Sequence, residues 1–216
     1  MERLAIEVVG LIAQALFSGR MIVQWVMSER ARKVVSPVIF WQMSMVASFL
    51  LCIYGWLGND FVIILGQAVA YYIYIWNLYA KGSWQQMHGV LRAIFLCVPM
   101  VAGVWLLAFH WDATMARLFT DAGIPMWLFV YGIAGQAVFS VRFIYQWLYS
   151  SRRGESVLPI GFWIISFAGS LLIIPYAVMR GKWAYLLGQV TGLIVYARNI
   201  MIARNERRCS ECRAER

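Results

Sequence analysis

The chain has 216 residues, of which 62% are hydrophobic and only 13% charged, and its mean hydropathy is +0.67. A soluble domain of this size cannot bury so many apolar side chains in one core, so the composition predicts an integral membrane protein. The net charge of +9 would favour nucleic-acid binding in a soluble chain. In a membrane protein the distribution of basic residues between the two sides explains it, and we expect no nucleic-acid partner.

Seven apolar stretches are long enough to cross a bilayer, which requires about twenty residues of helix. They are residues 4–27, 37–57, 60–80, 89–110, 126–149, 159–179 and 182–203. The first stretch contains Arg20 and no small-residue cleavage site follows a short apolar run, so we expect it to be retained as a membrane helix rather than removed as a signal peptide.

The first three stretches and the last three are copies of one another. Gly10 recurs as Gly132, 122 positions later, and about twenty-two identities share this offset over a unit of about seventy residues. The polar and aromatic pairs include Gln14 and Gln136, Phe17 and Phe139, Arg20 and Arg142, Gln24 and Gln146, Trp25 and Trp147, Trp41 and Trp163, Ser44 and Ser166, Gln67 and Gln189, Tyr74 and Tyr196, and Asn77 and Asn199. The duplication therefore preserved chemistry as well as hydrophobicity.

The repeat predicts the architecture. Each copy is a three-helix unit, and because three is odd, the unrepeated stretch 89–110 is needed to give both copies the same orientation. We expect an all-α membrane protein with seven transmembrane helices, arranged as two parallel three-helix repeats and a linker helix. The expected parts are a first repeat (1–82), the linker helix with its loops (83–124), a second repeat (125–203) and a basic cytoplasmic tail (204–216).

Basic residues divide unevenly between the two expected sides. If the loop after the first helix is cytoplasmic, the inner side collects Arg30, Arg32, Lys33, Lys81, Arg92, Arg152, Arg153 and the tail arginines. The outer side keeps Arg3, Arg117, Arg180 and Lys182. The positive-inside rule then predicts an external N-terminus and a cytoplasmic C-terminus.

Three arginines lie within the expected spans. Arg20 and Arg142 are duplicated, and Gln24 and Gln146 follow each of them at i+4 on the same helix face. The arginines either reach lipid headgroups at the interface or face the bundle interior, where a guanidinium beside an amide suits a phosphate or another anion. The third arginine is Arg198 of the second repeat, and Trp76 occupies the equivalent position in the first. This difference suggests that one half keeps an anion-facing residue that the other lacks.

Amides and aromatic rings accompany the arginines. Gln14, Gln136, Gln67 and Gln189 either hold helices together or bind a ligand. Tyr74 and Tyr196 lie near Asn77 and Asn199, a pairing of ring and amide that also suits sugars. The tryptophans at positions 25, 41, 147 and 163 flank the first loop of each repeat, where we interpret them as an interfacial aromatic belt.

The sequence contains no catalytic constellation. Its two histidines, His88 and His110, lie in the unrepeated region, and no acidic pair, metal-ligand spacing or phosphate-binding glycine loop occurs within a span. We expect no enzymatic activity, metal or cofactor. Cys209 and Cys212 form a lone C-x-x-C, interpreted as two cytoplasmic thiols in a flexible tail.

The repeated runs resemble the lipid-A-disaccharide synthase N-terminal domain. The resemblance rests on Gly10 to Ser44 and Gly135 to Ser170, with the endings Gly66-Gln67 to Asn77 and Gly188-Gln189 to Asn199. The first copy departs from the pattern at Ala13, Gly19 and Trp76. The resemblance implies a distant relation to PQ-loop and SWEET-type transporters, whose arrangement is three-plus-one-plus-three. The glycosyltransferase domain is not expected here, so that activity is not implied.

These observations lead to three hypotheses. The first is a bacterial inner-membrane transporter or flippase for a polyprenyl-phosphate-linked sugar or related glycolipid in lipopolysaccharide or lipid A biosynthesis or modification. Arg20 and Arg142 would hold the phosphate, the two tyrosines would stack on the sugar, and amides would bind its hydroxyls: Gln14, Gln24, Gln136, Gln146, Asn77 and Asn199. The alternatives are a SWEET-like facilitator of a free sugar and a non-catalytic membrane partner of a glycosyltransferase.

Overall fold

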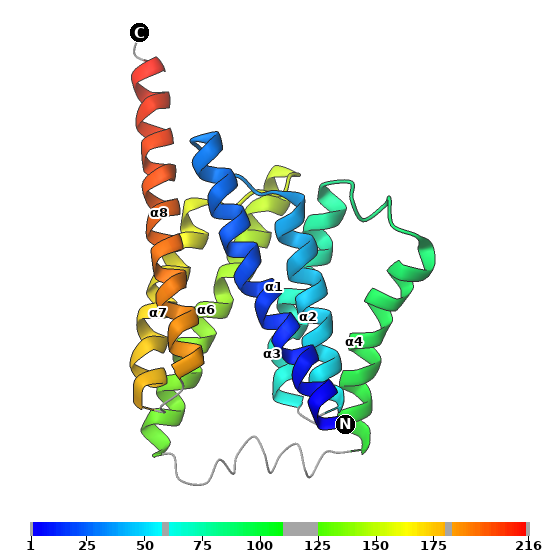
Figure 1. The fold of residues 1–216 in the computed structure, drawn as a ribbon. Coiled ribbons are helices and arrows are strands. Elements are labelled where there is room, and N and C mark those ends of the chain that lie inside the picture. Colours follow the sequence, from blue (N-terminus) through cyan, green and yellow to red (C-terminus); the bar gives the residue numbers. More distant parts are fainter. Residues whose placement is uncertain (1, 58–60, 110–124, 180–182, 215–216) are drawn as a thin grey trace. The chain divides into compact units, whose positions relative to one another are not determined.

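The computed structural model describes residues 2–57, 61–109, 125–179 and 183–214, and the regular structure within these ranges is entirely α-helical (Figure 1). The helices are α1 (Glu2–Ala31), α2 (Val38–Leu57), α3 (Phe61–Ala80), α4 (Gly89–Phe109), α6 (Met126–Arg153), α7 (Ile160–Met179) and α8 (Trp183–Ala214). Each predicted apolar stretch overlaps one of these helices, and α8 extends eleven residues beyond the predicted end at 203. The predicted all-α class is therefore confirmed.

Three of the helices are long and apolar enough to cross a membrane. Among the described residues these candidate spans are Val8–Ala31, Met126–Arg153 and Ile160–Met179, while Val38–Tyr54 and Gly89–Trp105 are shorter apolar segments. By length and composition, these helices are compatible with a membrane protein. Arg117, Arg180 and Lys182, on which the predicted outer side depends, lie outside the described residues, so the sidedness stays a prediction.

The chain forms two compact units, and α1 contributes to both. One unit contains Met1–Arg20 and Val38–Gly123, and the other contains Met21–Pro37 and Ile124–Arg216. In the first unit α2 packs against α3 and α4, which also contact each other. In the second unit α7 packs between α6 and α8 (Figure 1). The last part of the first repeat's opening helix is therefore built into the unit that contains the second repeat.

The first loop of each repeat begins and ends in the same way. α1 is followed by Arg32 with a φ of 52°, and α6 by Gly154 with a φ of 70°. Their backbone N–H groups donate to the carbonyls of Glu29 and Ser151, at 3.2 and 3.3 Å. The left-handed conformation suits glycine and is strained for arginine. A proline then immediately precedes α2 and α7, where its missing N–H is harmless.

A duplicated glycine–tyrosine contact brings the first and second helix of each repeat together. A Cβ placed on Gly10 would lie 3.1 Å from the ring of Tyr54, and one placed on Gly132 would lie 2.6 Å from the ring of Tyr176. A side chain at Gly132 would force the ring of Tyr176 to move, and one at Gly10 would require Tyr54 to shift by a few tenths of an ångström. Close helix packing therefore accounts for four of the duplicated residues without a role in binding.

The C-terminal segment is helical. α8 continues to Ala214, so Cys209 and Cys212 lie in its last turns, where both are exposed and have no disulfide partner. The prediction that these two thiols occupy a flexible tail is therefore wrong. Helix continuation fits the residues present, because Arg204 to Arg208 contains neither glycine nor proline and arginine and glutamate favour helix.

Candidate functional site

Arg20 lies inside the first unit among aromatic side chains. Only 6% of its surface is exposed. Its guanidinium carbon lies 4.5 Å from the ring centroid of Phe17, 5.2 Å from that of Phe40 and 5.5 Å from that of Tyr74. Its Nη1 group also donates a 2.6 Å hydrogen bond to Ser44 Oγ. The helices α1, α2 and α3 thus each supply part of one cluster around the cation.

Arg142 has the equivalent environment in the second unit. It is 7% exposed, and its guanidinium carbon lies 3.4, 4.6 and 5.8 Å from the ring centroids of Phe139, Phe143 and Phe162. Its Nη1 group donates to the hydroxyl of Tyr196 at 3.4 Å. Because the two arginines are buried, the alternative that they reach headgroups on the lipid-facing surface is contradicted. Both cations are held by rings, a geometry that is favourable when the cation is desolvated.

Two tryptophans complete these clusters. Trp41 and Trp163 are fully buried, and each packs edge-on against the preceding phenylalanine. Each also lies 6.1 Å from a tyrosine ring, that of Tyr74 or Tyr196. The belt interpretation is therefore wrong for this pair, because belt tryptophans are exposed to the lipid interface. Trp147, which is 37% exposed, remains compatible with it.

A duplicated glutamine and serine hold the first loop of each repeat. Gln24 donates to Ser28 Oγ at 2.9 Å and to the carbonyl of Val35 at 3.3 Å, and the N–H of Val35 donates to the same serine at 3.1 Å. Gln146, Ser150 and Val157 repeat the three bonds at 2.9, 2.9 and 3.1 Å. These side chains satisfy backbone groups just beyond a helix end, which is a structural role.

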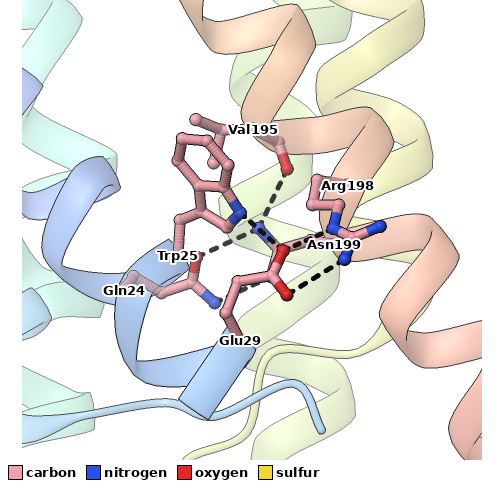
Figure 2. A network of polar contacts seen from close by, with 6 residues as sticks. All are labelled: Gln24, Trp25, Glu29, Val195, Arg198 and Asn199. Atoms are coloured by element: carbon pink, nitrogen blue, oxygen red, sulfur yellow. Dashed lines mark hydrogen bonds and ion pairs between the residues drawn. The ribbon is translucent and has the colours of Figure 1, made fainter. Parts of the chain in front are cut away.

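Gln24 also pairs with Asn199, as Figure 2 shows. The Gln24 amide donates to Asn199 Oδ1 at 2.9 Å, and the Asn199 amide donates back to Gln24 Oε1 at 3.1 Å and to the carbonyl of Val195 at 2.9 Å. Both side chains are fully buried. The second unit therefore joins α1 to α8 through a reciprocal amide pair, and two predicted site residues meet directly.

Beside the amide pair lies an ion pair that the sequence did not reveal (Figure 2). Arg198 donates from Nε and from Nη2 to the two carboxylate oxygens of Glu29, and Trp25 Nε1 donates to the same carboxylate at 3.0 Å. Arg198 is exposed. The structure thus places Arg198 opposite a carboxylate rather than in an aromatic cluster. The i+4 spacing of Trp25 and Glu29 indicates that these two side chains share a helix face, but it does not point to Arg198, and Glu29 has no acidic counterpart in the second repeat.

The other predicted amides occupy different surroundings. Gln67 and Gln189 accept hydrogen bonds from Ser48 and Ser170, at 2.9 and 2.8 Å, which agrees with a role in joining helices. Asn77 donates to the carbonyl of Ile73 at 2.8 Å and is fully buried. Gln14 is exposed and belongs to neither arginine cluster. The side chain of Gln136 lies outside the described residues.

The chemistry available at the site is therefore binding chemistry. Each unit offers a buried guanidinium, an aromatic wall and hydroxyl groups, which together suit an anionic ligand with a ring or hydrocarbon part. Among the described residues, histidine, cysteine, aspartate and glutamate form no group of three or more that could hold a metal.

Comparison with known proteins identifies the repeat. Residues 9–79 and 131–201 each match the lipid A biosynthesis N-terminal domain. The chain is 28% identical over 215 residues to a lipid-A-disaccharide synthase of Chlamydia felis (strain Fe/C-56) and 28% identical over 212 residues to that of Chlamydia abortus (strain DSM 27085 / S26/3). Each alignment covers 94% of this chain and 34% of the relative.

A third relative is the lipid-A-disaccharide synthase of Chlamydia caviae (strain ATCC VR-813 / DSM 19441 / 03DC25 / GPIC), which is 26% identical. That alignment covers 90% of this chain and 32% of the relative. This chain thus spans about a third of the length of the curated relatives it matches. No solved structure is significantly similar to it. On the strength of the two matched segments, the chain belongs to the lipid A biosynthesis N-terminal domain family and carries two copies of that domain.

Proposed function

We propose that this protein moves a polyprenyl-phosphate-linked sugar or a related glycolipid across the bacterial inner membrane, in the biosynthesis or modification of lipid A or lipopolysaccharide. The observation that carries the proposal is the pair of duplicated clusters, each with an arginine buried among aromatic rings. Burying an arginine in a membrane protein is costly, so such residues usually face a pathway or a ligand. Membership of a family described by lipid A biosynthesis supports a glycolipid as that ligand.

The proposed roles follow from the side-chain chemistry. Arg20 and Arg142 bind phosphate oxygens, because the planar guanidinium makes paired hydrogen bonds and is more weakly hydrated than an ammonium group. Tyr74 and Tyr196 lie beside them and present both a ring face and a hydroxyl to a sugar. A phosphate compensates the buried positive charge, and the low dielectric of the site strengthens that attraction.

The amides act when the bundle changes conformation. Gln24 and Asn199 satisfy each other in the present structure. To bind sugar hydroxyls they must exchange these bonds, so we assign them to a conformation in which α1 and α8 separate. A side-chain amide has both donors and acceptors, so each amide can replace its bonds to the other amide by bonds to the sugar without a net loss of hydrogen bonds. Ligand entry is thereby coupled to movement of the helices. Transport then proceeds by alternating access of the two repeats, within a three-plus-one-plus-three arrangement with a cytoplasmic C-terminus.

The test is translocation in proteoliposomes that contain the purified full chain. A fluorescent polyprenyl-phosphate sugar is compared with the corresponding free sugar, using the wild type, Arg142→Ala and the matched control Arg152→Ala, whose arginine lies in the last turn of the same helix and is exposed. We expect movement of the lipid-linked sugar only, lost in Arg142→Ala and retained in the control. Movement of the free sugar alone would instead identify a SWEET-like facilitator.

A second candidate function is a non-catalytic membrane partner of a glycosyltransferase. It is favoured by the curated relatives, which are named lipid-A-disaccharide synthases and are about three times as long as the matched region. This function predicts that neither sugar moves in proteoliposomes. It also predicts that a glycosyltransferase co-purifies with the chain and that its activity depends on the chain.

A further inference from the structure

Trp163 is a buried hydrogen-bond donor without an acceptor. The side chain is fully buried in α7. Within the described part of the chain its Nε1–H makes no hydrogen bond. Indole nitrogen can only donate, and buried donors in folded proteins nearly always have a partner. An acceptor atom from outside the chain would complete this position.

The surroundings of Trp163 indicate what that acceptor is. Its ring lies 6.1 Å from that of Tyr196, whose hydroxyl accepts from Arg142. Its other aromatic neighbour, Phe162, also lies 5.8 Å from the Arg142 guanidinium. An indole N–H, a phenol hydroxyl and a guanidinium thus belong to one buried cluster. Such a set is complementary to an anion that carries several acceptor oxygens.

We propose that the indole N–H of Trp163 donates to an anionic oxygen of a phosphate ester, which Arg142 and Tyr196 bind at the same time. The inference rests on the proposed function and adds a binding residue to it. Trp163 then contributes selectivity, because a neutral alcohol offers too few acceptor oxygens for three donors. A site that is built to hydrogen-bond an oxygen rejects the analogue that lacks it, since its own polar groups would remain unpaired.

The experiment follows the indole N–H directly. The full chain is labelled with 15N at tryptophan and placed in lipid nanodiscs, and the Trp163 signal is assigned by its loss in Trp163→Phe. Farnesyl phosphate, farnesol and inorganic phosphate are then added separately. We expect a downfield shift of the Trp163 N–H signal with farnesyl phosphate and none with farnesol.

Affinity provides the second readout. Trp163→Phe should bind farnesyl phosphate about tenfold more weakly, the usual effect of losing a hydrogen bond to a charged acceptor. The matched control Trp147→Phe, which removes an indole N–H from an exposed tryptophan of the same unit, should bind like the wild type. If Trp163→Phe does not fold, benzothienylalanine at this position replaces the N–H by sulfur and keeps the ring shape.

The outcomes separate this inference from the proposed function. Binding of farnesyl phosphate that depends on Arg142 but leaves the Trp163 signal and the Trp163→Phe affinity unchanged overturns the inference and leaves the function standing. An equal shift of the Trp163 signal with farnesol overturns the inference that the ligand is anionic. An equal shift with inorganic phosphate supports the donor role and identifies free phosphate rather than a lipid as the source. Absence of any farnesyl phosphate binding overturns both proposals.

Discussion

The carboxylate of Glu29 accepts two hydrogen bonds from the guanidinium of Arg198 and joins the end of α1 to α8 within the second unit. The repeat does not duplicate this pair, because Ser151 and Trp76 occupy the equivalent positions. Next to it lies the buried amide pair of Gln24 and Asn199. The contact between α1 and α8 thus combines an exposed ion pair with a buried hydrogen-bonded pair. We expect the two pairs to contribute differently to the free energy of unfolding.

Removing the two pairs should have unequal effects. Arg198→Ala should change the thermal unfolding of the purified chain in detergent very little, because water screens exposed ion pairs. Asn199→Ala should lower the free energy of unfolding by about 1–3 kcal/mol, since it leaves the buried Gln24 amide with unsatisfied groups. Unfolding midpoints at low and high salt test this. Equal destabilisation by the two variants would show that the exposed ion pair contributes as much as the buried amide pair, contrary to this prediction.

The repeat singled out Arg20 and Arg142 and aligned the two copies, but it did not predict the phenylalanines that surround each guanidinium. The pairing of Glu29 was out of reach, because it depends on α1 meeting α8, a helix of the other repeat. Trp41 and Trp163 were misplaced because the belt rule considers distance from a span's end and ignores the helix face. Gln14 was predicted to share the site of Arg20 but does not join its cluster. It lies six residues before Arg20, which on a helix of 3.6 residues per turn places the two side chains about 120° apart around the helix axis.

The backbone of Arg32 is strained, whereas the equivalent residue of the second repeat is a glycine and avoids the strain. Its φ of 52° is left-handed, and Gly154 occupies the equivalent turn. Arg32→Gly should therefore raise the free energy of unfolding by about 1 kcal/mol, and Gly154→Ala should lower it by a similar amount. The control Arg32→Ala removes the charge but keeps the strain, so it should give no gain. Chemical unfolding in detergent measures all three, and a gain in the control would attribute the effect to charge.

Gly169 is required for close packing of α6 and α7. A Cβ at this position would lie 2.9 Å from the Cα of Phe139, an atom of the backbone that cannot move away as a flexible side chain does. Gly169→Ala should destabilise the protein by about 1–3 kcal/mol, the usual cost of overpacking. The control Gly89→Ala, where a Cβ meets nothing within 4 Å, should be neutral or slightly stabilising. Thermal unfolding that ranks the two in the opposite order would contradict the packing argument.

The geometry of the arginine, beyond its charge, should be needed for function. Lysine keeps the positive charge of Arg142 but loses the planar fork and the stacking on Phe139, whose ring centroid lies 3.4 Å from the guanidinium carbon. Arg142→Lys should therefore reduce translocation of the lipid-linked sugar at least about tenfold, nearly as much as Arg142→Ala. Arg152→Lys should retain the wild-type rate, and all variants should insert equally into the membrane. Full activity of Arg142→Lys would mean that a point charge is sufficient and that paired hydrogen bonds to the phosphate are not what the cluster provides.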